Sequence, residues 1–539
     1  MRGRGLFWTV TVVALAARAA HLLFIWDHPF RDFWTVWNNS DMHQYVAWGR
    51  HLAGGDWLDA DTFRPWFTWQ EGIAPPEVWN AWFGAHVYYQ PPVYPYLLAV
   101  FINLTGGVDL FRACQIVLGA VNCGLIALLG GRLFGRTEGW IAGLAAALYA
   151  PFILYDAEFL RGTVVMTTQL ALLLALAARR AAWAGVALGL SYLAEPSILL
   201  FAPPASLWLW WRSRWRPALI FVSCAALSLL PLVARNALVG APLLSSTTRG
   251  PLAFVMGNAP DAQPAGALIP DSTGAILRRS GYSMMGTITE TLRLYDGRYG
   301  ALAAKQWEKL RALWGSFEVP DNPSFYYAAR ISPAVRFGLR FLPVAALGLV
   351  GLGFALPGIA REPGRLLLVL FLLSFHALFL LAHVVSRYRQ AMVMALLIFG
   401  AHAVARAIER DAGTVRRLAV PAAAALVALI LPWSPPAGYG YLRAAEYIVA
   451  SDLYVERGRP DQGIVELRSL IEQGRGDPGV QAAGSVVHYK LGRMLAATGN
   501  HAEAAASFRE ALAMDPTYGE AAEALEASEA ALRRQGKTP

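Results

Sequence analysis

The sequence predicts an all-α membrane protein, in which a bundle of about 11 transmembrane helices with long outer loops precedes a soluble helical repeat domain. Of the 539 residues, 56% are hydrophobic and only 15% are charged, whereas soluble domains carry about 25% charged residues. The 19 tryptophans and 20 tyrosines have rings that favour the membrane–water interface. The composition changes after Pro436, so the predicted domains are 1–436 and 437–539.

Basic residues are grouped in short turns between the apolar runs. The formal net charge is +9, but arginines in such turns orient membrane helices, which explains the excess better than nucleic acid binding does. No nucleic acid partner is therefore expected. Arg2 and Arg4 place the N-terminus in the cytoplasm, and the apolar run that follows is too long for a typical signal peptide.

Eleven apolar runs are expected to cross the membrane. In chain order they are 6–26, 110–133, 138–155, 162–178, 181–194, 197–211, 217–234, 337–358, 366–383, 390–408 and 418–433. The turns assigned to the inside carry clustered arginines, which supports this order. Because the number of crossings is odd, the C-terminal domain is expected on the outer side.

Two long stretches, 27–109 and 235–335, are expected to be outer loops, because polar residues, proline and glycine interrupt their apolar character. Within the first, residues 41–53 predict an amphipathic helix, and 93–105 predict a short apolar helix that lies at the membrane surface. A true crossing by 93–105 would reverse the orientation of everything after it.

The tail has the spacing of small and large residues that is typical of a tetratricopeptide repeat. The clearer copy contains Leu491, Gly492, Gly499, Ala504, Phe508, Ala511 and Pro516. Small residues let two helices cross closely, phenylalanine fills the gap, and proline ends the second helix. A looser copy precedes it, and 519–534 would cap the array. Two repeats are marginal alone, so we expect packing on the membrane part or on a protein partner; a stabilising lid is the alternative.

Asp41 is the first candidate for chemistry. It opens the predicted helix at 41–53, where a carboxylate held at the membrane surface could take a proton from a hydroxyl or amine that attacks a sugar carbon. Aspartate is also a favoured helix N-cap, and by pattern alone that role is the better explanation.

Asp156 and Glu158 form a second acidic site at the outer end of the run 138–155. They could bind a divalent cation, orient an acceptor or cap the next helix. Two carboxylates are a weak metal signal, because Mg²⁺ and Ca²⁺ need more oxygen ligands. Arg161, three residues beyond Glu158, could neutralise it.

Arg387 and Arg389, together with His383, lie at the outer end of the run 366–383. Arginine on the outer side opposes the usual charge bias, so it needs a local reason. Its planar fork suits a phosphate, and a lipid phosphate at this depth is one explanation. An interfacial anchor whose charged end reaches for water is the other.

Six features follow one another along the chain. They are Asp41 with Tyr45, Ala47 and Gly54-Gly55; the stretch Pro-Pro-Val-Tyr-Pro-Tyr-Leu-Leu-Ala at 91–99; Arg-Leu-Phe-Gly-Arg at 132–136; Asp156 and Glu158; Gly-Leu-Ser-Tyr-Leu-Ala-Glu-Pro at 189–196; and Ser-Arg-Tyr-Arg at 386–389. In this order they resemble the membrane-embedded glycosyltransferases with the GT-C fold, especially bacterial relatives of the protein O-mannosyltransferases and of the lipid A aminoarabinose transferase. The resemblance covers about residues 1–410.

The resemblance implies a sugar donor carried on a polyprenyl phosphate. It makes Asp41 the general base, Arg387 and Arg389, with His383, the contacts of the donor phosphate, and Asp156 and Glu158 the second acidic position, which in some members binds a metal. Two departures leave the donor sugar and the need for a metal open. First, Asp41 is a single acid in a position where the mannosyltransferases have paired acids. Second, Glu195 precedes a proline where relatives often carry Lys or Thr.

We therefore expect an inverting transferase in a bacterial inner membrane, with its acceptor, a protein, lipid or glycan, on the periplasmic side. Two other classes compete with it. A transporter or flippase of lipid-linked sugars would show inverted repeats and charges near the midplane, and neither is clear in the sequence. A non-catalytic scaffold would use the repeat domain to recruit partners and would tolerate the loss of Asp41.

Overall fold

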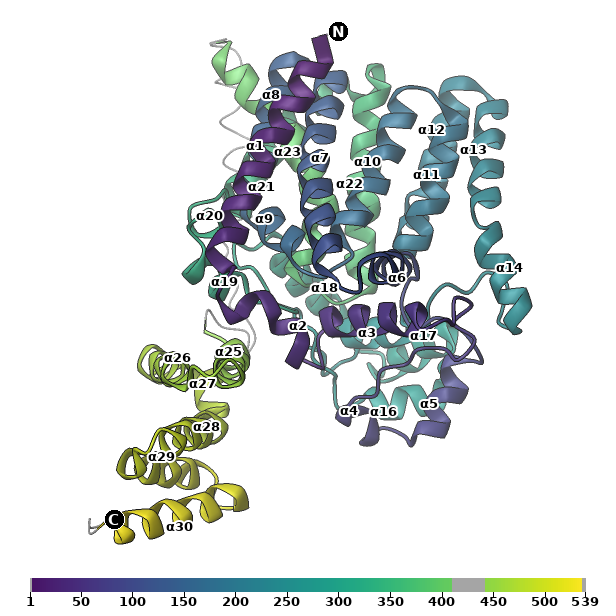
Figure 1. The fold of residues 1–539 in the computed structure, drawn as a ribbon. Coiled ribbons are helices and arrows are strands. Elements are labelled where there is room, and N and C mark those ends of the chain that lie inside the picture. Colours follow the sequence, from purple (N-terminus) through teal and green to yellow (C-terminus); the bar gives the residue numbers. More distant parts are fainter. Residues whose placement is uncertain (1, 410–441, 536–539) are drawn as a thin grey trace. The chain divides into compact units, whose positions relative to one another are not determined.

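The computed structural model describes residues 2–409 and 442–535 (Figure 1). Within these ranges every regular element is a helix. Tyr149 and Leu339 form an isolated β-bridge. The all-α prediction is therefore confirmed. The predicted crossing at 418–433 and the domain boundary after Pro436 lie outside the described residues.

Several helices are long and apolar enough to cross a membrane. Among the described residues there are six: Gly3–Ile25, Asp109–Leu133, Trp215–Val239, Phe341–Arg361, Pro363–Leu381 and Ser386–Ile408. The bent pair Ala150–Ala157 and Gly162–Ala177 would add a seventh. The chain is a multi-pass membrane protein, but this criterion does not reach the 11 predicted crossings.

Some predicted crossings are interrupted by proline or by a tertiary contact. The run 138–155 is split into α8 (Arg136–Ala147) and α9 (Ala150–Ala157). At the break the amide of Ala150 donates to the carbonyl of Leu339 at 2.9 Å, and Pro151 has no amide to offer. Similarly, the run 197–211 becomes the 3₁₀ turn η2 (Pro196–Leu200) and α12 (Ala202–Ser213).

The longer helices run side by side as a bundle (Figure 1). They are α1 (Arg2–Ile25), α7 (Asp109–Leu133), α10 (Gly162–Ala177), α11 (Ala181–Ala194), α13 (Trp215–Ser228), α21 (Phe341–Ala355), α22 (Pro363–Leu381) and α23 (Gln390–Ile408). The helix α14 (Leu230–Val239) continues α13, and η3 (Leu356–Arg361) follows α21. A Cβ at Gly351 of α21 would lie 1.7 Å from the carbonyl oxygen of Phe399 in α23, so only glycine permits this close crossing.

Two helices of the first outer loop lie across one end of the bundle (Figure 1). They are α3 (Asp41–Ala53) and α6 (Val93–Thr105), with the bounds expected from the sequence. They pack tightly, because a Cβ at Gly49 would lie 2.8 Å from the Cβ of Leu98. The 13 residues of α6 are too few for a crossing, which needs about 20.

The two outer loops share one hydrophobic core, which contains Phe67, Trp79, Leu252, Val255 and Leu277. The first loop contributes to this core through α4 (Thr68–Glu71) and α5 (Pro76–Phe83), and the second through α15 (Gly250–Asn258) and α16 (Thr273–Ser280). The second loop also contains α17 (Met284–Arg293), α18 (Tyr299–Trp314) and α20 (Pro333–Arg336). The stretch 235–335 is therefore largely helical, although its glycine and polar content suggested a loop. Aromatic and aliphatic side chains spaced between the polar residues build this core.

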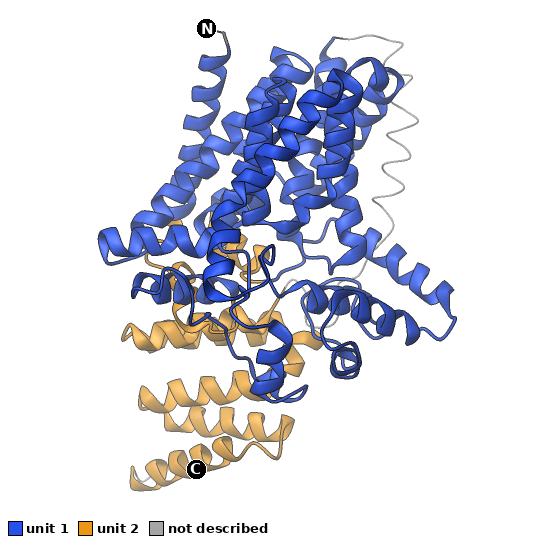
Figure 2. Cartoon of the chain, turned by 90° about the vertical axis from the view of Figure 1, so that its right-hand side faces the viewer, with its two compact units in different colours: residues 1–23, 41–321, 333–434 blue, residues 24–40, 322–332, 435–539 orange. Residues whose placement is uncertain are grey.

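Two compact units make up the chain (Figure 2). The first contains residues 1–23, 41–321 and 333–434, and the second contains 24–40, 322–332 and 435–539. The second unit thus combines the repeat region with two short segments of the outer loops.

The second unit is a stack of helical hairpins. Its helices are η1 (Pro29–Asp32), α2 (Phe33–Val36), α19 (Phe325–Ile331), α25 (Ala444–Glu456), α26 (Pro460–Gln473), α27 (Pro478–Ala482), α28 (Gly484–Ala497), α29 (His501–Met514) and α30 (Gly519–Arg534). A Cβ at Gly492 would lie 2.6 Å from the ring of Phe508, which is the close crossing that the repeat spacing predicted. The capping helix has the predicted bounds.

Ion pairs tie the first hairpin to the loop segments within this unit. Glu466 of α26 pairs with Arg330 and lies 3.9 Å from Nε2 of His28. Glu446 of α25 accepts a hydrogen bond from the amide of Ser324 at 3.0 Å. The looser repeat thus gains a second packing surface, which offsets its weak sequence pattern.

Candidate active site

Asp41 is the first residue of α3, and both of its carboxylate oxygens are bound. Oδ1 accepts a hydrogen bond from Nε2 of Gln90 at 2.9 Å, and Oδ2 accepts one from Nη2 of Arg387. Gln90 accepts in turn from the hydroxyl of Tyr45, one turn further along α3. The side chain of Asp41 is 14% exposed, so the carboxylate is fixed in position and still accessible.

Arg387 links Asp41 to a second carboxylate. It lies in the 3₁₀ turn η4 (Ser386–Arg389) that leads into α23. Its Nε is 2.6 Å from Oδ2 of Asp321, and its guanidinium lies 5.1 Å from the ring centre of Tyr388. One guanidinium is therefore shared by two acids, which come from positions 41 and 321 of the chain.

The charges around Asp41 favour its ionised form. Burial opposes ionisation, but the charges of Arg387 and Arg249 and the hydrogen bonds that Asp41 accepts outweigh it and hold the pKa of Asp41 well below its usual range. Arg249 immediately precedes α15, and its Nη1 donates to the hydroxyl of Tyr89 at 3.1 Å. Asp41 is thus a carboxylate at neutral pH.

A cavity of about 620 Å³, including its open side, reaches Arg387. Its apolar wall is formed by side chains of α10, α22 and α23 and the turn before α10, namely Leu160, Val165, Met166, Phe375, Leu378 and Ala391. Its polar lining includes Arg161, Glu195, Ser197, Tyr388 and Gln390. The cavity therefore offers a cationic end and a hydrocarbon-like wall to the same ligand.

Arg161 is the second cation of this cavity. Its Nη2 lies 2.8 Å from Oε2 of Glu195. Arg161 therefore pairs with Glu195, whereas its position in the sequence predicts a pair with Glu158. Nη1 of Arg161 is buried and has no hydrogen-bond partner within the described residues. A half-buried guanidinium with a buried, unused donor is suited to an anionic ligand.

Asp156 pairs with neither Arg387 nor Arg161, the two arginines of the cavity. Its carboxylate accepts hydrogen bonds from Nε of Arg18 at 2.7 Å and from the hydroxyl of Thr163 at 2.5 Å, and both acid and arginine are 1% exposed. Asp156 is therefore committed to holding α1, α9 and α10 together. Arg18 lies inside an apolar helix, and nothing in the sequence pattern marked it as a partner of Asp156.

Glu158 is also buried, and one glutamine side chain holds its backbone and that of Asp156. Nε2 of Gln115 donates to the backbone carbonyls of both residues, at 3.0 and 2.5 Å, and so fixes the turn between α9 and α10. Neither acid belongs to a group of three possible metal ligands within the described part of the chain. The carboxylate of Asp156 is taken up by Arg18 and Thr163, and a role of this pair in acceptor or metal binding stays a prediction.

Arg389 has a structural environment that differs from that of Arg387. It is 1% exposed, its Nη2 donates to the carbonyls of Ala312 and Phe317, and its Nη1 lies 3.6 Å from Glu318. The guanidinium also stacks over Phe341 at 4.4 Å. Arg389 does not line the cavity that Arg387 reaches, although the two residues are only two positions apart in the 3₁₀ turn. A phosphate contact by Arg389 stays a prediction from the sequence.

His383 is buried against the ring of Tyr388, with ring centres 5.7 Å apart. Burial, and then the neighbouring charges of Arg249 and Arg387, lower the pKa of His383 to about 3. The imidazole is therefore neutral at pH 7, and the positive charge that a phosphate would need comes from the arginines.

Gln90, Arg249, Asp321 and the Arg161–Glu195 pair escaped the sequence analysis. Gln90 stands directly before the Pro-Pro of 91–92, and Arg249 lies in the polar stretch after Asn236. Both are brought to Asp41 by pairing of the two outer loops, where the amide of Thr248 donates to the carbonyl of Tyr88 at 3.0 Å. Nothing in the local pattern of the sequence predicts that contact.

Comparisons with known proteins point to the same group as the sequence features. Residues 89–236 match the family described as dolichyl-phosphate-mannose-protein mannosyltransferase, and residues 485–518 match the tetratricopeptide repeat. These matches confirm the predicted resemblance to membrane glycosyltransferases and the repeat. No curated protein matches the chain in sequence.

Similar solved structures include two membrane transferases. The archaeal oligosaccharyltransferase AglB from Archaeoglobus fulgidus, in complex with an inhibitory peptide and a dolichol-phosphate, is 14% identical with a TM-score of 0.40, over 83% of this chain and 55% of that one. ArnT from Cupriavidus metallidurans, bound to undecaprenyl phosphate, is 16% identical with a TM-score of 0.41, over 92% of this chain and 74% of that one. The chain thus spans about half the length of AglB.

Proposed function

We propose that this protein is an inverting glycosyltransferase of a bacterial inner membrane, which moves a sugar from a polyprenyl phosphate to an acceptor on the periplasmic side. The observation that carries the proposal is the Asp41–Arg387–Asp321 cluster beside a cavity with apolar walls. The family match at 89–236 supports an isoprenoid-phosphate donor.

The donor would bind with its phosphate between Arg387 and Arg161 and its polyprenyl chain along the apolar wall. Arginine binds phosphate through paired N–H donors, and Nη1 of Arg161 is an unused buried donor. Hydrocarbon side chains such as Val165 and Leu378 suit an isoprenoid chain. The same site therefore satisfies both halves of an amphipathic lipid.

Asp41 would act as the general base. It takes the proton of the acceptor hydroxyl or amine as that atom attacks the anomeric carbon. The bond from this carbon to the phosphate oxygen breaks, the electron pair leaves with the polyprenyl phosphate, and in-line attack inverts the carbon. Arg387 and Arg161 would stabilise the charge that develops on the leaving phosphate.

The low pKa of Asp41 in the free protein suggests how donor binding activates this base. While Arg387 is bonded to Asp41, the carboxylate is a weak base. A phosphate that draws Arg387 away removes one of the interactions that lower the pKa of Asp41 and adds a negative charge nearby, and both effects raise it. Asp321 would hold Arg387 during this exchange. The base thus becomes effective only when a donor is present.

The acceptor is a protein, lipid or glycan, and the repeat domain is the candidate surface for a protein partner. Tetratricopeptide repeats present extended surfaces for such contacts. We further propose that the N-terminus is cytoplasmic and the repeat domain periplasmic.

Sugar transfer in proteoliposomes tests the proposal. The full chain would be supplied with radiolabelled sugars on polyprenyl phosphate and with a periplasmic extract as acceptor. We expect Asp41→Asn to lower transfer by about 10² to 10⁴-fold, because the general base is lost while the side chain keeps its shape. Asp61→Asn is the matched control, since Asp61 is an exposed acid of the same outer loop.

The outcomes separate the competing functions. Unchanged transfer in Asp41→Asn would remove the catalytic role of Asp41. If the wild-type protein moves the lipid-linked sugar across the bilayer without transferring it, the protein is a transporter. If it does neither, a scaffold function replaces the proposal.

A further inference from the structure

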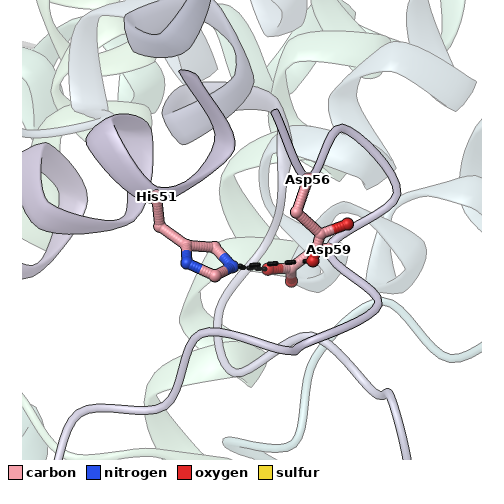
Figure 3. A group of neighbouring side chains, drawn as sticks. All are labelled: His51, Asp56 and Asp59. Atoms are coloured by element: carbon pink, nitrogen blue, oxygen red, sulfur yellow. Dashed lines mark ion pairs between the residues drawn. The ribbon is translucent and has the colours of Figure 1, made fainter. Parts of the chain in front are cut away.

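A second cluster of ionisable side chains lies at the opposite end of α3 from Asp41. His51, in the last turn of α3, points towards Asp56 and Asp59 of the loop that follows (Figure 3). Its Nε2 is 3.7 Å from Oδ2 of Asp56 and 3.6 Å from Oδ1 of Asp59, and the three atoms all lie within 4.8 Å of one another. None of the side chains that act in the proposed transfer belongs to this cluster.

These distances do not fit a direct hydrogen bond between the imidazole and either carboxylate. A charge-assisted hydrogen bond would bring nitrogen and oxygen to about 2.7–2.9 Å. Ligand atoms that each lie about 2.0–2.2 Å from a tetrahedral Zn²⁺ are about 3.3–3.6 Å apart. The observed separations of 3.6 and 3.7 Å are close to that spacing, with the nitrogen aimed between the two acids.

Asp59 gives an independent reason to expect a ligand. Its side chain is fully buried; Oδ1 accepts hydrogen bonds from Nε1 of Trp48 and the amide of Phe63, whereas Oδ2 has no hydrogen-bond partner. The nearest cation, Arg235, is 3.9 Å away. That arginine donates to the backbone carbonyls of Leu58, Asp59 and His86. A buried carboxylate is thus only partly compensated, which is costly unless a further positive charge is near.

We propose that His51, Asp56 and Asp59 bind a divalent transition-metal ion of the Zn²⁺ class, with solvent completing its coordination. One imidazole nitrogen with two carboxylates suits Zn²⁺, whereas Ca²⁺ and Mg²⁺ prefer oxygen ligands alone. The two acids balance the charge of the ion. Both His51 and Asp56 are partly exposed, which gives the ion a path from solvent.

The ion would join the end of α3 to the loop 56–63. Because α3 begins with Asp41, the site stiffens the helix that carries the proposed base without touching the reacting atoms. The role is therefore structural, and it stands whether or not the protein transfers a sugar.

Metal binding by the purified full chain in detergent tests the site directly. After removal of any affinity tag and treatment with EDTA, Co²⁺ would be titrated and its visible absorption recorded, and bound Zn²⁺ would be measured by mass spectrometry. We expect one ion per chain. We also expect Zn²⁺ to raise the thermal unfolding temperature, because a ligand that binds only the folded state stabilises it.

Two variants and one control decide the assignment. His51→Gln and Asp56→Asn should each weaken Zn²⁺ binding by more than about tenfold and abolish the thermal shift. Asp56→Asn keeps an oxygen that can accept from the amide of Asp61, so the loop should still fold. His488→Gln removes an imidazole of the repeat domain and should bind as the wild type does.

Each remaining outcome would overturn the proposal. If the wild type binds no ion after EDTA treatment, the cluster is an ordinary set of ion pairs. If the ligand variants bind as tightly as the control, the ion lies elsewhere. If Ca²⁺ or Mg²⁺ competes equally with Zn²⁺, the assigned metal class is wrong.

Discussion

Two acid–arginine pairs in the bundle unit have the same chemistry and opposite surroundings. Asp156 and Arg18 are each 1% exposed, and the carboxylate accepts from Arg18 and Thr163. Asp41 and Arg387 are 14% and 12% exposed; Arg387 has a second acid beside it and lines a cavity. The first pair is shielded from solvent and its carboxylate is fully hydrogen-bonded by protein groups. The second pair is the one that we propose to exchange partners with a ligand.

This difference shows that residue type alone does not distinguish Asp156 from Asp41. An acid at the outer end of an apolar run is a candidate site by charge and position. Whether it is available for chemistry depends on its partner, and Arg18 lies 138 positions away in the chain. Four predictions test the contrast, from the largest expected effect to the smallest.

Removing the charge of Asp156 should be the most damaging change. Asp156→Asn leaves Arg18 buried without a counter-charge, which costs about 3–5 kcal/mol and is a large share of the stability of a protein. We expect most of the variant to aggregate in detergent size-exclusion chromatography. Asp41→Asn, near a solvent-accessible cavity, should remain monodisperse. Equal yields of the two variants would remove the structural distinction.

Arg387 and Arg389 should respond differently to replacement by lysine. Arg387→Lys keeps the charge but loses the fork, so we expect the KM for the donor to rise by about 10- to 100-fold, the equivalent of about 1.5–3 kcal/mol of charged hydrogen bonds. Arg389→Lys should instead lower the thermal unfolding temperature and leave the KM of the surviving protein unchanged. A KM effect in both variants would place Arg389 at the donor site as well.

Gly119 provides a steric test of the Asp156–Arg18 pair. A Cβ at this position would lie 2.1 Å from Oδ2 of Asp156, so Gly119→Ala should displace the carboxylate and destabilise the protein by about 1–3 kcal/mol. Gly5→Ala in α1 is the control, because no atom lies within 4 Å of its Cβ. A shift in the unfolding temperature that is the same for both would contradict the packing.

The pH dependence of transfer should report on the exchange of Arg387. The pKa of Asp41 is lowered in the free protein, so Asp41 stays ionised and kcat/KM should not fall on the acid side until below the ordinary aspartate value of about 3.9. In the donor complex the pKa of Asp41 rises, so kcat should fall at a higher pH than kcat/KM does. Coincident acid limbs would argue against the exchange.

The sequence predicted the parts of the fold that depend on local pattern. Apolar runs and their arginine-rich turns indicated a multi-pass protein, helical spacing gave the bounds of α3 and α6, and small residues at Gly492 and Ala504 indicated the repeat. The division of 138–155 was missed, because the contact between Ala150 and Leu339 that ends the helix is distant in sequence.

What the sequence by itself determined is the class of the protein and the identity of Asp41 and Arg387 as candidates, because hydropathy, charge and helical period are local properties. Tertiary structure alone decided which acid meets which arginine. Asp41 is paired with Arg387, Asp156 with Arg18 and Arg161 with Glu195, and each pair joins segments at least 34 positions apart. Electrostatic energy depends on distance and burial in the folded state, so that information appears only once the helices are packed.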